Sequence, residues 1–212
     1  MSPIDGTFIR AEAFVSQTWA EGLDKNGRLI PRVETTSGSK GVLIHPGNTG
    51  GTNWWSPTHD PATKFFVVPA IEQGMVYFPN PGGADSARSS NESYPSGTGR
   101  SLYTSLRALD AETGKLIWEK RNASRNENNA TGSVISTASG LLFGSDESTF
   151  FSLLTKSGET LWSFITGANI SAAPISYQSD GKQFVAVIAG KSIIVFGLPN
   201  RLDDKPKKII FK

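Results

Sequence analysis

An internal repeat limits the folds open to this chain. Residues 108–118 read ALDAETGKLIW and residues 152–162 read SLLTKSGETLW, an offset of 44 positions (152 − 108). In each copy a strand-forming run is followed by a Thr-Gly or Ser-Gly turn and then by a run that ends in tryptophan. Units of roughly 40–50 residues that each carry several short strands are typical of propeller blades. The repeat therefore predicts a β-propeller.

Other strand-forming runs give the extent of this propeller. Runs at 64–70 and 75–78 are rich in aromatic and β-branched residues, a nearly complete second unit covers 132–164, and a third begins at 171. We therefore expect an all-β fold, a partial β-propeller of about three four-stranded antiparallel blades plus a leading strand. The pattern fades after Pro199, which predicts a propeller over 1–199 and a C-terminal tail over 200–212.

Two stretches between these runs are predicted to be loops. Residues 19–40 contain a tight-turn signal at 22–28 and then become polar, and we interpret them as a long surface connection. Residues 80–99 consist largely of Gly, Ser, Pro and Asn, and predict a long loop with little to bury.

Composition and charge narrow the function classes. The formal net charge is +2, too small to indicate a nucleic-acid partner, and no apolar run is long enough to span a bilayer. Cysteine is absent, so the chain can form neither a disulfide nor a thiolate metal site. Its first residues lack the basic-then-apolar form of a secretory signal.

The stretch 50–57, GGTNWWSP, carries the candidate binding chemistry. Glycines let a backbone approach a ligand closely, indoles offer flat apolar faces, and an amide both donates and accepts hydrogen bonds. This combination suits a planar cofactor with polar edges. The alternative is that Trp54 and Trp55 pack a strand onto its neighbour while Asn53 caps a turn.

Several motifs occur in the order in which they occur in the pyrroloquinoline quinone (PQQ)-dependent alcohol and sugar dehydrogenases, and the chain resembles the C-terminal part of these quinoproteins. The motifs are HPG at 45–47, GTNW at 51–54, ALDAETGKLIW at 108–118, GLLFGSDE at 140–147, GKQFVAV at 181–187 and FGLP at 196–199. The resemblance implies an eight-bladed propeller with PQQ and a calcium ion on its axis, which oxidises alcohols or sugars in the periplasm.

The resemblance also implies roles for individual residues. Asn53 and Trp54 match the Asn-Trp pair whose side chains approach PQQ in the family, and Lys191 lies in a shortened version of a second loop that contacts the cofactor. Trp55 points to the opposite face of an extended segment and is assigned to packing. Trp118 and Trp162 match the tryptophans that dock one blade to the next.

In the resembled family, the general base, the calcium ligands, the tryptophan stacked under PQQ and the adjacent-cysteine disulfide belong to the part that precedes this stretch. We therefore assign no catalytic or metal-binding residue, and expect the chain to contribute part of a PQQ pocket and to be inactive alone. Residues 6–11 resemble the end of a blade's outer strand, which implies missing upstream blades. The expected partners are these blades or a second copy of the chain, with a small alcohol or sugar as substrate of the complete enzyme.

The sequence also allows a different function for the propeller and ordinary roles for its histidines and adjacent acids. A non-catalytic propeller scaffold that binds partners through its loops would carry the same repeats. His45 and His59 have no ligand spacing and are predicted to be ordinary surface or loop histidines. Asp146 and Glu147 are adjacent and are predicted to be solvated turn acids, because neighbouring strand residues face opposite sides.

Overall fold

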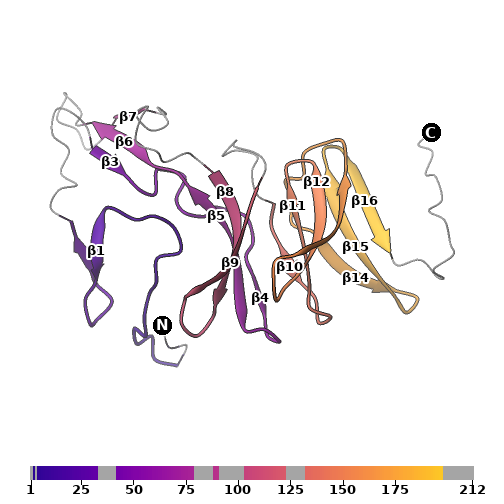
Figure 1. Ribbon diagram of the computed structural model, residues 1–212, viewed down its shortest axis with the longest axis horizontal. Coiled ribbons are helices and arrows are strands. Elements are labelled where there is room, and N and C mark those ends of the chain that lie inside the picture. The colour runs from indigo at the N-terminus through magenta and orange to yellow at the C-terminus, as the bar shows by residue number, and fades with distance from the viewer. Residues whose placement is uncertain are drawn as a thin grey trace.

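The computed structural model of the chain contains only strands and their connections among the residues that it describes, which are 2, 4–32, 42–78, 88–90, 103–122 and 132–197 (Figure 1). These strands form five antiparallel sheets. The predicted all-β class is confirmed.

Two of the sheets have four strands, and within each sheet the strands lie in chain order, although β6 and β7 of another sheet intervene between β5 and β8. Blade 1 consists of β4 (Thr58–Asp60), β5 (Phe65–Glu72), β8 (Tyr103–Asp110) and β9 (Leu116–Arg121). Blade 2 consists of β10 (Ile135–Ser136), β11 (Leu141–Asp146), β12 (Thr149–Leu154) and β13 (Thr160–Ile165). The two copies of the sequence repeat form β8–β9 and β12–β13, as predicted.

Three smaller sheets complete the described part. Blade 3 consists of β14 (Ile175–Ser179), β15 (Lys182–Ala189) and β16 (Ser192–Gly197). A further sheet joins β3 (Val42–Ile44), β6 (Met75–Phe78) and β7 (Arg88–Ser90), and a hairpin joins β1 (Ala20–Leu23) to β2 (Leu29–Pro31). Blades 1, 2 and 3 lie side by side in chain order, so the architecture is a partial propeller (Figure 1).

Apolar side chains fill the spaces between these blades. Strand side chains alternate between faces, and the adjacent Phe150 and Phe151 on β12 accordingly enter different cores. The core between blades 1 and 2 consists of Val67, Leu106, Ala108, Val134, Leu142, Phe151 and Leu153. The core between blades 2 and 3 consists of Phe150, Ile170, Val185, Val187 and Ala189.

The repeated tryptophans hold adjacent blades together. The indole Nε1 of Trp118 on β9 donates a 2.9 Å hydrogen bond to the carbonyl oxygen of Thr155, in the β12–β13 turn of blade 2. Trp162 on β13 meets Phe196 of blade 3 edge-on, with ring centroids 5.1 Å apart. Their predicted role in blade docking is confirmed.

The structure departs from the loop predictions in two places. Part of the stretch 19–40 is the β1–β2 hairpin, closed by a turn in which Gly27 N donates to Asp24 O at 3.0 Å. Part of 80–99 is β7, which pairs with β6. Residues 33–41, 79–87 and 91–102 lie outside the described residues, as do residues 198–212 with the predicted tail.

Candidate functional site

Asn53 and Trp54 lie on the loop that leads from β3 into β4. Just after them, Ser56 N donates to Ser133 Oγ at 2.9 Å, and Val134 N donates to Ser56 O at 3.1 Å. These bonds join the segments that lead into β4 and β10, the first strands of blades 1 and 2. Asn53 and Trp54 therefore lie at the end of the propeller where the first strand of each blade begins.

Both candidate side chains are accessible. Trp54 is 59% exposed, and Asn53 is exposed as well. Asn53 Nδ2 donates to Thr49 O at 3.3 Å, and its Oδ1 accepts from Trp54 N at 2.9 Å. An amide has two N–H donors and two acceptor lone pairs, so one of each remains for a ligand. Trp55 is buried and packs as assigned, but it does not point to the opposite face, because its ring lies beside that of Trp54 with centroids 5.4 Å apart.

The loop is fixed at its base by the end of β5. Gly47 N donates to Gln73 O at 2.9 Å, and the Thr49 hydroxyl donates to Gln73 Oε1 at 2.8 Å. Ile71 N donates to Gly51 O at 2.8 Å. A Cβ on Gly51 would lie 2.4 Å from Val15 Cγ2, so only glycine lets the N-terminal segment approach this closely.

Lys191 lies in the turn between β15 and β16, two blades away from this loop. Its neighbour Gly190 has φ = +58° and donates its N–H to Asn169 O at 2.9 Å. The antiparallel pairing of β14, β15 and β16 puts this turn at the end of blade 3 where β14 begins. The three candidates therefore share one end of the propeller, without a hydrogen bond or ion pair between Lys191 and the other two in the described part.

His45 lies in the bend after β3, as predicted for a loop histidine, but it is not at the surface, whereas the surface position predicted for His59 is confirmed. His45 is 2% exposed, and His59 is exposed. The His45 imidazole occupies space left by Gly74, whose Cβ would lie 2.5 Å from Nε2. The backbone of His45 is held by Thr18, which receives its N–H on Oγ1 at 2.9 Å and donates its own N–H to His45 O at 3.0 Å.

The two adjacent acids also differ from their prediction. Asp146 ends β11 and Glu147 lies in the following turn, and both are half-buried instead of fully solvated. No group of three or more His, Asp or Glu side chains that could hold a metal ion occurs among the described residues. Within those residues, no helix is long and apolar enough to cross a membrane.

Sequence reasoning missed a buried charge network on blade 1. Arg107 on β8 contacts Glu72 of β5 and Glu119 of β9, each at an N–O distance of 2.8 Å. It also donates to the carbonyl oxygen of Phe14, and Ser16 N donates to both Glu72 oxygens at 3.2 Å. An arginine inside a strand of small and apolar residues was the available signal, but its partners lie on other strands.

The network shifts the pKa values of its members. Burial disfavours the charge of Arg107, but the hydrogen bonds to Glu119 and Glu72 outweigh it and raise its pKa. Burial alone would raise the pKa of Glu119, but hydrogen bonds from Arg107, Ser105 and Arg121 outweigh it and lower that pKa. The network therefore ties the segment around Phe14 to the face of blade 1.

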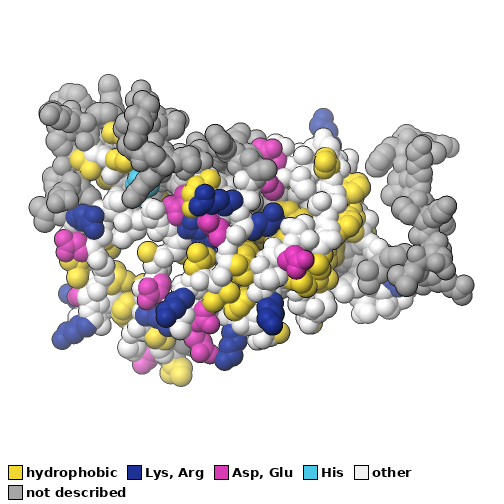
Figure 2. Space-filling model, viewed as in Figure 1, with side chains coloured by type: hydrophobic (Ala, Val, Ile, Leu, Met, Phe, Trp, Pro, Cys, Tyr) yellow, Lys and Arg dark blue, Asp and Glu magenta, His cyan; other side chains and the backbone are white. Residues whose placement is uncertain are grey.

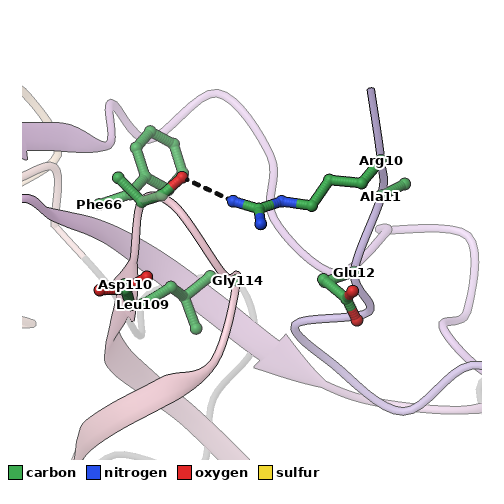
Figure 3. A pocket seen from close by; sticks show the side chains of 8 residues that line it. Arg10, Ala11, Glu12, Phe66, Leu109, Asp110 and Gly114 are labelled. Carbon is green, nitrogen blue, oxygen red and sulfur yellow. Dashed lines mark hydrogen bonds between the residues drawn. The ribbon is translucent and has the colours of Figure 1, made fainter. Parts of the chain in front are cut away.

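Two open hollows flank the same N-terminal segment. One has a volume of about 250 Å³ and lies between Arg10–Glu12 and the β8–β9 turn, where Arg10 Nη2 donates to Ala111 O at 3.0 Å (Figure 3). The second has a volume of about 370 Å³ and is lined by residues 13–16 together with Arg107, Leu109, Gly114 and Leu116. Neither hollow includes Asn53, Trp54 or Lys191, so neither is the candidate cofactor site.

Antiparallel sheets that stack in chain order and dock through repeated tryptophans define the chain as part of a β-propeller. No family model matches it. It is 30% identical over 205 residues to the quinoprotein alcohol dehydrogenase PedH of Pseudomonas putida, a match that covers 88% of this chain and 32% of PedH. It is 32% identical over 206 residues to a quinoprotein ethanol dehydrogenase of Pseudomonas putida, covering 88% of this chain and 31% of that protein.

Solved structures agree with these relatives. The quinohemoprotein alcohol dehydrogenase of Comamonas testosteroni superimposes with a TM-score of 0.75 at 26% identity, over 89% of this chain and 29% of that chain. A europium-containing methanol dehydrogenase superimposes with a TM-score of 0.66 at 28% identity, over 82% of this chain and 31% of that chain. Over most of its length the chain is homologous to quinoprotein alcohol dehydrogenases, and it spans about a third of the length of the curated relatives it matches.

Proposed function

We propose that this chain supplies part of the PQQ pocket of a quinoprotein alcohol or sugar dehydrogenase, through Asn53 and Trp54. The observation that carries the proposal is the pairing of an exposed indole with a partly unsatisfied amide, on a loop fixed at the end of the propeller where its first strands begin. Homology to quinoprotein alcohol dehydrogenases supports the choice of ligand.

The chemistry of these side chains fits that ligand. PQQ, when bound, supplies the quinone that accepts two electrons and two protons from the alcohol. The exposed face of Trp54 offers apolar area to a planar ring system. Asn53 can donate one N–H to a carbonyl or carboxylate oxygen, and Lys191 adds a positive charge for an anionic cofactor.

The proposal assigns no proton transfer to this chain. A base near the reacting hydroxyl and a cation beside the quinone are required for alcohol oxidation. In the complete enzyme we propose that calcium is this cation, and we assign neither its ligands nor the base to residues of this chain. The chain alone is therefore expected to bind PQQ without turnover, and the complete enzyme is proposed to act on small alcohols or sugars in the periplasm.

The test separates binding from turnover. Purified chain with PQQ and CaCl₂ is assayed for dye-coupled oxidation of ethanol and of glucose, alone and mixed with the remaining propeller of a related quinoprotein. We expect PQQ binding in both samples and oxidation only in the mixture. Oxidation by the chain alone would contradict the proposed division of labour.

The second candidate function is a non-catalytic propeller that binds a protein partner. It is favoured by apolar side chains exposed on blade 3, such as Ile193 at 72% and Ile175 at 59%. A scaffold of this kind predicts no PQQ binding, and the absence of binding would favour it over the quinoprotein proposal.

A further inference from the structure

Blade 3 presents an open edge and an uncovered face. Among the described residues it has three strands, with β16 at one edge, whereas blades 1 and 2 have four. Strand register puts five exposed apolar side chains on the face turned away from blade 2. They are Ile175 (59% exposed), Tyr177 (40%), Ile188 (45%), Ile193 (72%) and Val195 (45%).

Apolar side chains are visible at the surface over the strands of blades 2 and 3, in the right-hand half of Figure 2. An uncovered apolar sheet face next to an unpaired strand edge is a site at which another sheet can add.

The N-terminal segment is an extended stretch without strand partners. Residues 8–13 lie along blade 1 but make no backbone–backbone hydrogen bond within the described part of the chain. Side chains anchor the segment instead. Arg10 donates to Ala111 O, and Arg107 donates to Phe14 O. The backbone N–H and C=O groups of residues 8–13 therefore remain available to a neighbouring strand.

This segment is placed like the fourth strand of a blade. Its sequence Gly6-Thr7-Phe8-Ile9-Arg10 corresponds to Gly114-Lys115-Leu116-Ile117-Trp118, and Gly6 and Gly114 share φ = +71°. Trp118 donates to Thr155 O in the next blade, and Arg10 donates to Ala111 O, which holds the same place in its repeat as Thr155. Arg10 thus takes the position of a docking tryptophan against blade 1.

We propose that the chain associates head to tail with a second copy of itself, in which residues 8–13 of one copy add to β16 of the other as the fourth strand of blade 3. A three-stranded blade and an unpaired fourth strand in one sequence complement each other, which argues for a second copy as the occupant. The same contact packs the apolar face of blade 3 against Phe66 and Leu116 on the exposed side of blade 1, which are 38% and 54% exposed.

The hollows beside the N-terminal segment agree with this arrangement. These hollows, of about 250 and 370 Å³, lie between the segment and blade 1 and offer room for side chains of an added blade. The contact joins two different surfaces, so it is heterologous and generates a ring or a chain of copies. It involves none of the three cofactor candidates and does not depend on quinone binding.

The repeat also predicts the register. The β15–β16 turn at 190–191 in blade 3 corresponds to the β11–β12 turn at 147–148 in blade 2. Val195 is therefore the counterpart of Ser152, and Ser152 pairs with Trp162 of the fourth strand. Arg10 of the second copy is therefore expected opposite Val195. Antiparallel pairing then puts Ala13 opposite Ser192, and both residues are exposed in the single chain.

Mixing two single-cysteine chains tests this register in trans. The native chain contains no cysteine, so Ala13→Cys and Ser192→Cys each introduce one exposed thiol. Directly opposed strand residues have the Cα separation that a disulfide needs. Under mild oxidation without PQQ we expect a disulfide-linked pair of chains in the mixture. The matched control mixes Ala13→Cys with Ser179→Cys, an exposed residue on β14, the strand farthest from the open edge.

A second measurement covers the case in which cross-linking is inefficient. We expect light scattering at micromolar concentration to give a mass above the 22.7 kDa of one chain. Ala11→Pro, which removes one N–H from the unpaired segment, should return the mass to that of one chain, and Ala11→Ser should not. A native chain that stays at 22.7 kDa and cross-links no better than the control would overturn the proposal. The same result is expected if residues 198–212 of the same chain, and not a second copy, were to cover β16.

Discussion

The indole of Trp118 and the main chain at Gly158 fit together across the junction of blades 1 and 2. A Cβ on Gly158 would lie 2.8 Å from Trp118 Cδ2, so the missing side chain makes room for the ring. The ring in turn reaches Thr155 O with its Nε1 donor at 2.9 Å. One residue thus contributes both packing and a hydrogen bond to the contact between blades.

These two contributions can be separated by substitution. Trp118→Phe keeps an aromatic ring but removes the donor, and we expect it to lower the free energy of unfolding by about 1 kcal/mol. Trp118→Ala removes the ring as well and should cost about 3 kcal/mol. Urea denaturation at pH 7 measures both. Equal losses in the two variants would show that the hydrogen bond, and not the ring, holds the junction.

Gly158→Ala should be destabilising for two reasons. Gly158 has φ = +71°, a conformation that side chains disfavour, and its new methyl group would collide with Trp118. Gly140→Ala is the matched control, because Gly140 has φ = +78° but no heavy atom within 4 Å of the added Cβ. We expect a loss of about 1 kcal/mol for the control and about 2–4 kcal/mol at Gly158. Equal losses would contradict the proposed collision.

The buried charge network should be more sensitive than a surface pair. Arg107→Met leaves Glu72 and Glu119 without their shared cation in a buried setting, and we expect a loss of about 3–5 kcal/mol in the free energy of unfolding. Lys64→Met is the control, because the pair Lys64–Glu112 is exposed and should contribute nothing measurable. A small effect at Arg107 would mean that Ser16 N suffices for Glu72, and Ser105 and Arg121 for Glu119, once the shared cation is removed.

The same network predicts a pH dependence. The pKa of Glu119 is lowered from its ordinary value of 4.5 in the folded chain, so its carboxylate stabilises the fold above pH 4.5. This contribution is lost as the pH falls through the lowered pKa. Urea midpoints measured from pH 6 to pH 3 should therefore fall less steeply for Glu119→Gln than for the native chain. Identical slopes would remove Glu119 from the acid response.

The repeated elements of the fold could be predicted from the sequence, because each repeat carries its own local pattern. The run around Leu109, the Thr-Gly turn and Trp118 recur one blade later, and β8–β9 and β12–β13 form where the repeat predicts them. The β1–β2 hairpin was not predicted as a pair of strands. Its turn chemistry at Asp24–Gly27 was visible, but strands of four and three residues give little alternation.

Contacts between distant parts of the chain could not be predicted. His45 is buried because Gly74 leaves room for its ring, and Arg107 is paired because Glu72 lies on a neighbouring strand. The docking role of Arg10 had no local signal either, since an arginine stands where the repeat has a tryptophan. The Asn53–Trp54 motif could be found in the sequence, but the bonds from Gln73 that anchor its loop required the fold.

Equilibrium dialysis against PQQ tests the cofactor proposal most directly. The native chain is expected to retain PQQ, and Asn53→Ala and Trp54→Ala are expected to weaken retention about five- to thirtyfold, since the loss of one hydrogen bond or one stacked ring corresponds to about 1–2 kcal/mol. Trp19→Ala is the control, because Trp19 is 40% exposed but directly precedes the β1–β2 hairpin and lies outside the stretch 50–57. Retention of PQQ by the native chain and by Trp19→Ala, with loss in the two loop variants, is the predicted result. Equal retention by all four chains, or no retention by the native chain, would contradict the assignment of Asn53 and Trp54 to a quinone pocket.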